Sequence, residues 1–319
     1  MELRQLRYLD AVARRRSFTQ AALDLHLAQS ALSQQVGRLE RELGVDLLRR
    51  TTRRVEVTEM GELVLARARR ALADVDGVRA DLDALQGLVR GTLRLGGLPP
   101  VGPVHPAELI AGFSRVHPGI AVTVRAGVAF PLLGQLRDGG LDLVLALVDP
   151  DLLDGLEGVR LFEEELVVIA PLDHPLARAK RARVERLDGE PLVTYAPGSA
   201  LRDALLALAP GGRIVAEANE LATVRELTAH GLGVSLMPRS VVAPHGDRLA
   251  IRPLTPRRAL PVSLVWRAGE RPTPAAQAFR EHVLSAIADA SGAAQSGRSA
   301  GAPSSRSASS TIRPSSPRT

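Results

Sequence analysis

The segment AQSALSQQVGRLERELG, from Ala28 to Gly44, restricts the fold of this chain more than any other stretch. Its apolar residues follow the spacing i, i+4, i+7 and i+11, which predicts one amphipathic helix with a single buried stripe. That stripe consists of Leu32, Val36, Leu39 and Leu43. The opposite side begins with serine and glutamine, where a solvated face would usually carry lysine and glutamate. Its composition therefore suggests a partner other than water.

Further helices and a ribbon are predicted around this segment. The stretch LRQLRYLDAVA has leucines near helical spacing, and the SFTQAALDLHL that follows has Ser17 three positions before Gln20, the pattern of a capping box that starts a second helix. A short turn at LHLAQ precedes the helix described above. After Gly44, LLRRTTRRVEVTEMG predicts a two-stranded ribbon with an arginine-rich tip. Thr58 is placed to cap the next helix.

The positive charge lies at the two ends of the chain. The sequence of 319 residues carries a formal net charge of +6, and Lys180 is its only lysine. Residues 1–58 hold 11 arginines and 7 acidic residues, residues 291–319 hold 4 arginines and no acid, and the remainder holds 26 basic and 28 acidic residues. This distribution favours a polyanionic partner for at least one end.

A long helix is predicted from Glu59 to about Val89, because no proline interrupts this stretch. Five apolar positions approximate a heptad seam that Arg79 interrupts. They are Leu65, Ala68, Leu72, Val75 and Leu82. Such a helix is too long and too polar to pack alone, so we expect it to pair with the same helix of a second subunit.

From Gly91 onward the sequence alternates between strand and helix patterns, which predicts a mostly parallel α/β sheet in two lobes. The last segment, residues 291–319, consists mainly of serine, alanine, glycine, proline and arginine and is predicted to be disordered. We therefore expect four parts in the chain: a small helical domain with a ribbon at residues 1–58, a long helix at 59–90, an α/β domain at 91–290 and a disordered tail at 291–319.

Composition excludes several classes of function. The chain has no cysteine, so disulfides, thiolate chemistry and cysteine-based metal sites are ruled out. No apolar run approaches the roughly 18 residues of a membrane span, and the N-terminus has no signal core, so we expect a cytoplasmic protein without a membrane partner. The histidines form no HxxxH or HExxH pair and no serine lies in GxSxG, so neither an enzyme nor a cofactor is expected.

The order of these motifs resembles the LysR-type transcriptional regulators. The likeness begins with SFTQAALDLHLAQSALSQQVGRLERELGVDLLRRTTRRVEVTEMG and continues through GTLRLG, HPLA and TAHGLGVSLMP, up to about Asp289. It implies an N-terminal winged helix-turn-helix, a long linker helix, and a two-lobed α/β effector-binding domain similar to periplasmic solute-binding proteins. By resemblance the protein is a regulator of transcription that binds double-stranded DNA as a homodimer or homotetramer.

The resemblance gives the polar helix face a role, because base edges in the major groove offer donors and acceptors that Ser, Gln and Arg match. Arginines of the ribbon would reach the minor groove or the flanking backbone. Ala28 stands where relatives often carry a capping serine, so the helix lacks that cap. The candidate DNA contacts are Thr19, Gln29, Ser30, Ser33, Gln34, Arg38, Arg50, Arg53 and Arg54.

In the second half, the resemblance implies a first lobe at residues 91–161 and 263–290 and a second lobe at 162–262, with a small-molecule effector between them. The candidate effector contacts are Leu98, Pro100, Val101, Phe130, Thr194 and Ser199. Both polar residues also have a purely structural interpretation. Ser199 stands at a helix start and could serve only as its N-cap, and Thr194 could be an ordinary residue of the preceding strand. The prolines of GGLPPVGPVHP have no N–H to donate, so this wall of the cleft would offer few donors to an anion. The alternative is that these prolines only stiffen a loop.

These residues predict an effector with an apolar body and at most one anionic group. The alternative is a constitutive DNA-binding regulator whose α/β half holds no ligand and serves only assembly. The sequence does not decide between activation and repression.

Overall fold

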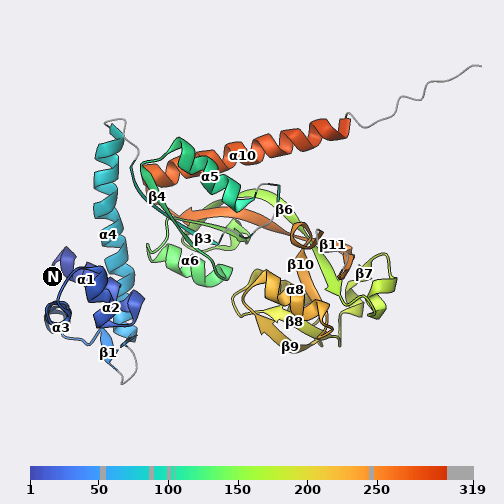
Figure 1. Ribbon diagram of the computed structural model, residues 1–319, viewed down its shortest axis with the longest axis horizontal. Helices are drawn as coiled ribbons and strands as arrows, with labels where there is room; N and C mark the ends of the chain where they lie inside the picture. The colour runs from blue at the N-terminus through green and yellow to red at the C-terminus, as the bar shows by residue number, and fades with distance from the viewer. Residues whose placement is uncertain are drawn as a thin grey trace, which may run out of the picture.

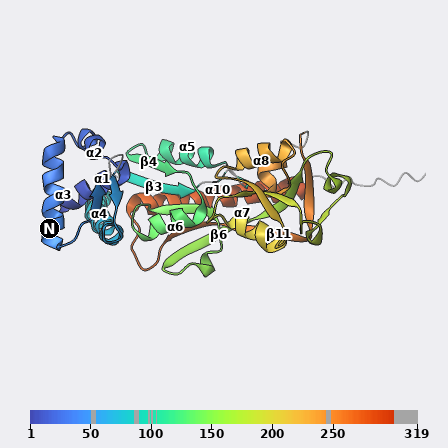
Figure 2. The same cartoon turned by 90° about the horizontal axis from the view of Figure 1, so that it is seen from below.

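The structure is a computed structural model that describes residues 1–50, 55–85, 90–97, 99, 102–103, 105–243 and 248–299. A small helical unit at the N-terminus is followed by a long helix and then by an elongated α/β part with two lobes (Figure 1). Figure 2 shows these parts in one row, with the third helix of the N-terminal unit at the end far from the lobes.

The N-terminal unit is a winged helix-turn-helix in which three helices share an apolar core and two short antiparallel strands form the wing. Its elements are α1 (Leu3–Arg15), α2 (Phe18–Asp24), α3 (Gln29–Leu43), β1 (Leu48–Arg50) and β2 (Val55–Val57). Ser17 caps α2, as predicted, because its Oγ accepts the N–H of Gln20 at 3.3 Å. Ala28 precedes α3 without a side-chain cap.

The predicted apolar stripe of α3 is confirmed for its first three members. Leu32, Val36 and Leu39 are buried in the core of the N-terminal unit. Leu43, in the last turn, stays 38% exposed, since α3 ends at Gly44, whose left-handed backbone turns the chain away.

The long helix α4 (Glu59–Leu85) leaves the N-terminal unit at Thr58, whose Oγ1 accepts the N–H of Gly61 at 3.0 Å. The cap predicted at Thr58 is therefore present. Gly61 permits a close contact, because a Cβ there would lie 2.0 Å from the carbonyl oxygen of Leu47. The first turn of α4 thus rests directly on the chain that enters the wing.

The seam predicted on α4 needs a correction. Leu65 and Leu72 are 0% and 9% exposed, and with Ala68 they lie in the core of their own N-terminal unit, against α1. A heptad pattern shows which residues share a face but not which element covers that face. Val75 is half-buried and Leu82 is exposed. The exposed apolar residues of α4 are instead Met60, Leu63, Val78 and Leu82.

The α/β part is built on a seven-stranded sheet with the order β10-β6-β11-β5-β3-β4, and β7 pairs with β11 beside this path. The strands of this sheet are β3 (Gly91–Gly97), β4 (Ile120–Arg125), β5 (Leu143–Leu147), β6 (Leu156–Ala170), β7 (Ala182–Arg183), β10 (Ser235–Pro238) and β11 (Ala250–Arg267). A separate parallel pair consists of β8 (Pro191–Tyr195) and β9 (Arg213–Ala218).

Helices cover these sheets on both lobes. The α-helices are α5 (Pro106–Val116), α6 (Ala129–Arg137), α7 (Ala200–Leu208), α8 (Leu221–Ala229), α9 (Arg239–Val242) and α10 (Pro274–Ser299). Short 3-10 turns occur at Pro150–Leu152, Pro175–Arg178 and Val184–Arg186.

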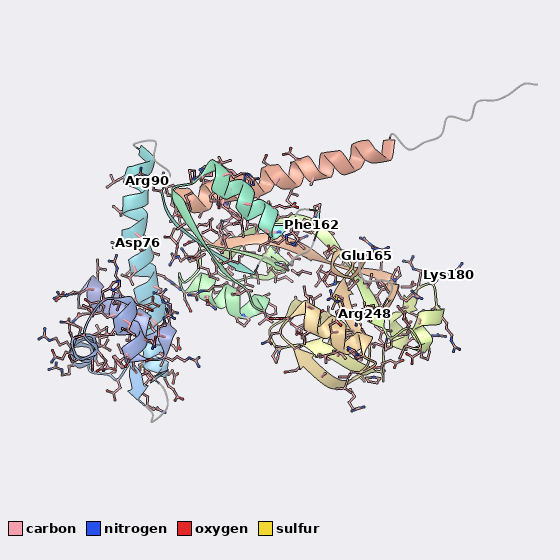
Figure 3. The ribbon with its side chains drawn as sticks, viewed as in Figure 1. Asp76, Arg90, Phe162, Glu165, Lys180 and Arg248 are labelled. Carbon is pink, nitrogen blue, oxygen red and sulfur yellow. The ribbon has the colours of Figure 1, made fainter. Side chains whose placement is uncertain are left out.

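Two long strands, β6 and β11, connect the lobes as an antiparallel pair. The expectation of a mostly parallel sheet holds for β3 with β4 and β5, but β6, β10 and β11 pair antiparallel. The reason is that the chain leaves the first lobe along β6 and returns along β11. Phe162 and Glu165 lie on β6 between the lobes (Figure 3). The lobe boundaries predicted at residues 161 and 263 fall within these two strands.

The last helix corrects the prediction for the tail. α10 continues through Ser299, so residues 291–299 are helical, whereas the sequence predicted disorder from Ser291. The stretch contains no proline, so nothing in it stops the helix of the folded domain from continuing, although it includes two glycines, Gly292 and Gly297. Residues 300–319 lie outside the described chain. Among the described helices, none combines the length and apolarity needed to cross a lipid bilayer.

Candidate nucleic-acid interface and effector cleft

The polar face predicted on α3 is open to solvent. Gln29, Ser30, Gln34 and Arg38 are exposed, while Ser33 is half-buried at the margin of this face. Because the buried stripe holds the opposite side of α3 against the core, these side chains point away from the unit. The structure thus brings the predicted residues of α3 together on one surface, with uncharged donors and acceptors near its start and arginine further along.

Thr19 belongs to the first turn of α2 and is exposed. Arg50 is the last residue of β1, and its side chain is outside the described atoms. Arg53 and Arg54 lie outside the described residues altogether. The described part of the wing is its two strands, in which Arg49 lies opposite Glu56.

Glu40 ties the wing to α3, a role that the sequence did not reveal. One oxygen of Glu40, Oε1, accepts the backbone N–H groups of Leu47 and Leu48 at 2.9 and 3.0 Å. Both leucines are buried, so these donors have little access to water. The angle between α3 and the start of the wing consequently depends on one carboxylate. Its sequence signal is weak, because Glu40 has the same appearance as the neighbouring acid Glu42.

A cleft of about 540 Å³ lies between the two lobes. The first lobe contributes the end of β3, the loop before α6 and the end of β5, and the second lobe contributes the N-terminal ends of α7 and α8. The lining residues are Gly97, Pro99, Ala126–Ala129, Leu145–Leu147, Tyr195, Ser199–Leu201 and Asn219–Ala222. Most of them are apolar, and the lining contains one carboxylate, Glu220, and no lysine or arginine among the described residues.

Gly97 lies in a place in the lining where only glycine fits. Its φ of +81° is a left-handed conformation, and a Cβ there would lie 2.1 Å from the carbonyl oxygen of Leu145. Glycine at this position lets β3 end beside β5 and open the cleft. On the other side, Tyr195 is buried and donates from its hydroxyl to the carbonyl of Leu236 at 3.3 Å. Burial raises the pKa of this phenol, so Tyr195 stays neutral.

The predicted effector contacts divide into three groups. Ser199 lines the cleft, is 8% exposed, and begins α7 without capping it through its side chain. Thr194 is a correction, since it is fully buried and is not part of the lining. Adjacent strand residues point to opposite faces, so Tyr195 and not Thr194 meets the cleft. Leu98, Pro100 and Val101 lie outside the described residues.

Phe130 also differs from its predicted role. Its side chain is 42% exposed and is absent from the cleft lining, while its backbone N–H donates to the carbonyl of Gly198 in the second lobe at 3.1 Å. This bond joins the two lobes beside the cleft, because Phe130 and Gly198 are each adjacent in sequence to a lining residue. Sequence analysis could not find it, because it uses the backbone and joins segments that are distant in the chain.

Metal binding has no support among the described residues, where no group of three or more histidine, cysteine, aspartate or glutamate side chains could hold an ion. His174 illustrates the structural use of histidine, because its Nδ1 accepts the N–H of Leu176 at 3.2 Å.

Two family descriptions match the chain over most of its length. Residues 3–62 match "Bacterial regulatory helix-turn-helix protein, lysR family", and residues 86–288 match "LysR substrate binding domain". The chain is 35% identical over 303 residues to the RuBisCO operon transcriptional regulator of Allochromatium vinosum, covering 90% of this chain and 97% of that protein.

Solved structures agree with this likeness. Full-length OxyR from Pseudomonas aeruginosa, as a cysteine-to-aspartate variant, has a TM-score of 0.69 and 30% identity and covers 90% of this chain and 94% of its own. Full-length CbnR complexed with its target DNA has a TM-score of 0.59 and 25% identity, with 89% and 99% of the two chains covered.

Proposed function

This chain belongs to the LysR family of transcriptional regulators, and we propose that it binds a specific operator through α3 and responds to a small molecule held between its lobes. The homologues are regulators and not enzymes, so the chain is not an enzyme. The observation that carries the proposal is the exposed Gln29, Ser30, Gln34 and Arg38 on the side of α3 opposite the core.

Gly37 supports the contact with DNA. A Cβ at this position would meet no atom of the chain within 4 Å, so folding of the N-terminal unit does not require glycine there. A bare backbone on the exposed side allows a close approach to the floor of a groove. Arg38 follows on the same surface and supplies a positive charge for the phosphates.

The substitution Gln34→Ala tests this proposal. A side chain that reads a base edge contributes about 1–3 kcal/mol of discrimination, so the variant should lose affinity for its operator and relax preference at one base pair. Binding to random duplex should change little at the same salt concentration. The matched control is Gln277→Ala, an exposed glutamine on α10 that should leave both affinities unchanged. Equal losses of Gln34→Ala on operator and random DNA would exclude base reading.

The cleft favours an effector with a substantial apolar body and at most one anionic group. Its described lining is mainly apolar and offers no cationic side chain, and its donors are Ser199, Asn219 and the N–H groups that begin α7 and α8. A second carboxylate on the ligand would face Glu220 without a counter-charge. A thermal-shift screen of aromatic acids, amino acids and dicarboxylates tests this, because a bound ligand raises the melting temperature. A dicarboxylate as the tightest ligand would contradict the cleft chemistry.

A chain without cysteine responds differently from a thiol sensor. Two relatives of this chain are named hydrogen peroxide-inducible genes activators. With no cysteine in its 319 residues, this protein has no thiol to oxidise, so thiol oxidation is not its signal. If no ligand stabilises the protein, the α/β part serves assembly alone and DNA binding is constitutive.

Self-association is proposed through α4. LysR regulators act as oligomers, and the exposed apolar residues Met60, Leu63, Val78 and Leu82 lie along α4 at helical spacing. Their burial in a homodimer or homotetramer would place two copies of α3 on one operator. We place this activity in the cytoplasm.

A further inference from the structure

Four arginines gather where the N-terminal unit meets the first lobe. Arg14 comes from α1, Arg69 from α4, Arg94 from β3 and Arg125 from β4, and all four line one cavity of about 280 Å³. We call these four residues the interdomain arginine cluster. Thr92, Thr123 and Gln135 add neutral polar groups to the same lining, and the only large apolar side chain is Leu141.

The cluster carries more positive charge than its carboxylates balance. Asp10 is shared, because it pairs with Arg14 at 2.6 Å and with Arg69 at 2.8 Å. Asp142 binds Arg94 through both of its oxygens, at 2.8 and 3.2 Å. Among the described residues, the side-chain partner of Arg125 is the neutral Gln135, whose Oε1 accepts from Nη1 at 2.7 Å.

The electrostatic surroundings of Arg125 agree with this imbalance. Burial and the positive charges of Arg14 and Arg69 lower the pKa of its guanidinium, and Asp10 offsets them only in part. A half-buried cation surrounded by like charges costs free energy. An anion placed among these groups would remove that cost.

The cavity exists only because the two parts of the chain are packed together. α4 lies against the turn before β5, where Gly139 has a φ of +75° and a Cβ would come within 3.2 Å of the backbone nitrogen of Arg70. Arg70 also donates from Nε to the carbonyl of Arg137 at 2.9 Å. Two sides of the cavity therefore belong to the N-terminal unit and α4, and two belong to the first lobe.

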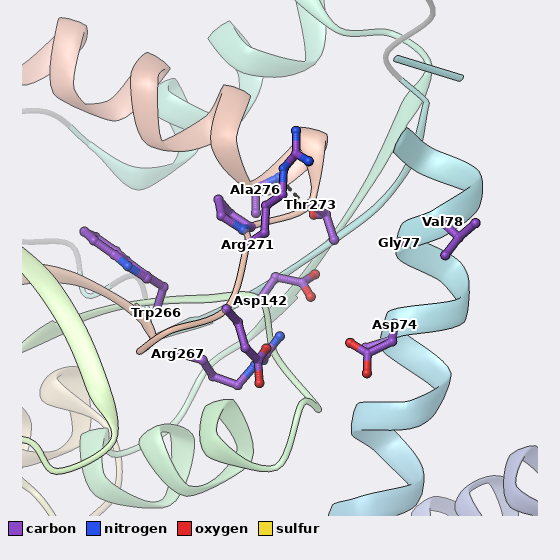
Figure 4. A pocket seen from close by; sticks show the side chains of 12 residues that line it. Asp74, Gly77, Val78, Asp142, Trp266, Arg267, Arg271, Thr273 and Ala276 are labelled. Atoms are coloured by element: carbon purple, nitrogen blue, oxygen red, sulfur yellow. Dashed lines mark hydrogen bonds and ion pairs between the residues drawn. The ribbon is translucent and has the colours of Figure 1, made fainter. Parts of the chain in front are cut away.

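A neighbouring cavity further along α4 does not share this charge. Its lining includes Asp74, Asp142 and Glu270 beside Arg267 and Arg271, so acids are at least as numerous as bases (Figure 4). The excess of positive charge is therefore absent from this end of the interface. It extends from the interdomain arginine cluster into an adjoining cavity, where Arg7 and Arg90 join Arg14, Arg69 and Arg94 beside three aspartates.

We propose that the interdomain arginine cluster binds a small, multivalent oxyanion of the phosphate class and thereby holds the N-terminal unit against the first lobe. Guanidinium groups bind phosphate oxygens in pairs, and hydroxyl and amide groups satisfy the remaining acceptors. The polar lining disfavours the apolar effector of the interlobe cleft, so this is a second site with a different ligand. An anion seated here contacts both parts of the chain and couples their relative orientation to its concentration.

The anion is free in solution and is not a phosphate of the operator. Both views place α3 at the end of the molecule, with α4 between α3 and the first lobe (Figures 1 and 2). The cluster therefore lies on the side of the N-terminal unit that faces the lobes, away from the surface proposed to contact DNA.

The first test measures the melting temperature of the full chain in inorganic phosphate and in sodium chloride at equal ionic strength. At ten times the dissociation constant, phosphate should raise the melting temperature by about 2 °C or more above the chloride value. Arg125→Gln should lose this increment, because it removes the cation without a carboxylate partner. Arg115→Gln, an exposed arginine of the same lobe outside the cluster, is the matched control and should retain it.

A second variant keeps the test decisive if Arg125→Gln fails to fold. Arg14→Gln lies on the opposite side of the cavity, and its side chain is 55% exposed, so its loss should not disturb the core. It should also lose the phosphate increment. Equal shifts in phosphate and chloride, or an unchanged shift in the folded cluster variants, would overturn the proposal.

Hydrogen exchange of the intact protein locates the bound anion. Phosphate should slow exchange in both α1 and β4 and leave lobe-two amides of α7 and α8 unchanged. Protection confined to α7 and α8 would mean that phosphate occupies the interlobe cleft and would overturn the assignment. A loss of affinity of Arg125→Gln for random duplex in phosphate-free buffer would assign the cluster to the DNA backbone instead.

Discussion

Removing the carboxylate of Glu40 should destabilise the wing and weaken DNA binding. In Glu40→Ala, the buried N–H groups of Leu47 and Leu48 lose the oxygen that accepts them at 2.9 and 3.0 Å. A buried donor left without a partner costs about 1–3 kcal/mol, and two donors that share one oxygen should cost about 2–4 kcal/mol together. Glu40→Gln keeps a neutral acceptor and should cost less, since charge-assisted hydrogen bonds are about twice as strong as neutral ones.

Hydrogen exchange at the amides of Leu47 and Leu48 measures this cost directly. A loss of 2 kcal/mol corresponds to exchange that is about 30 times faster. The matched control is Glu42→Ala, because among the described residues Glu42 pairs with the exposed amine of Met1, and its side chain is 51% exposed. An exposed pair of this kind contributes about 0–1 kcal/mol. If both variants exchange at the same rate at these amides and bind the operator equally, Glu40 does not position the wing.

Three further outcomes are expected from other parts of the chain. Leu63→Asp should weaken self-association in light scattering while the N-terminal unit stays folded, because Leu63 is exposed on α4. Leu72→Asp should unfold that unit, because it places a charge in the core. Identical behaviour of the two variants would contradict the assignment of faces on α4. Ser199→Ala should weaken the response to a cleft ligand about tenfold and leave operator affinity without ligand unchanged, and a titration with the parent's response would remove Ser199 from the site. A chain ending at Ser299 should melt within about 1 °C of the full chain, and a drop of several degrees would show that residues 300–319 dock on the body.

The sequence by itself determined the features that depend on local spacing. The period of Leu32, Val36 and Leu39 defined the buried side of α3, and by exclusion its polar side. The caps at Ser17 and Thr58 were also predictable, because each hydroxyl accepts an N–H three residues further on. Alternating strand and helix patterns predicted an α/β second half for the same reason, since each element is coded within its own few residues.

Only the tertiary structure decided what each surface meets. Leu72 and Val78 are both apolar residues of α4, yet one lies in the core of the N-terminal unit and the other is exposed. Glu40 acquired its role because folding brings the wing beside it. Thr194 lost its predicted role because it lies on the buried side of β8, opposite the side on which Tyr195 meets the cleft. The interdomain arginine cluster joins residues from α1, α4, β3 and β4. Periodicity shows which face of an element is apolar or charged, but the partner of that face comes from segments distant in the chain, and only packing brings them together.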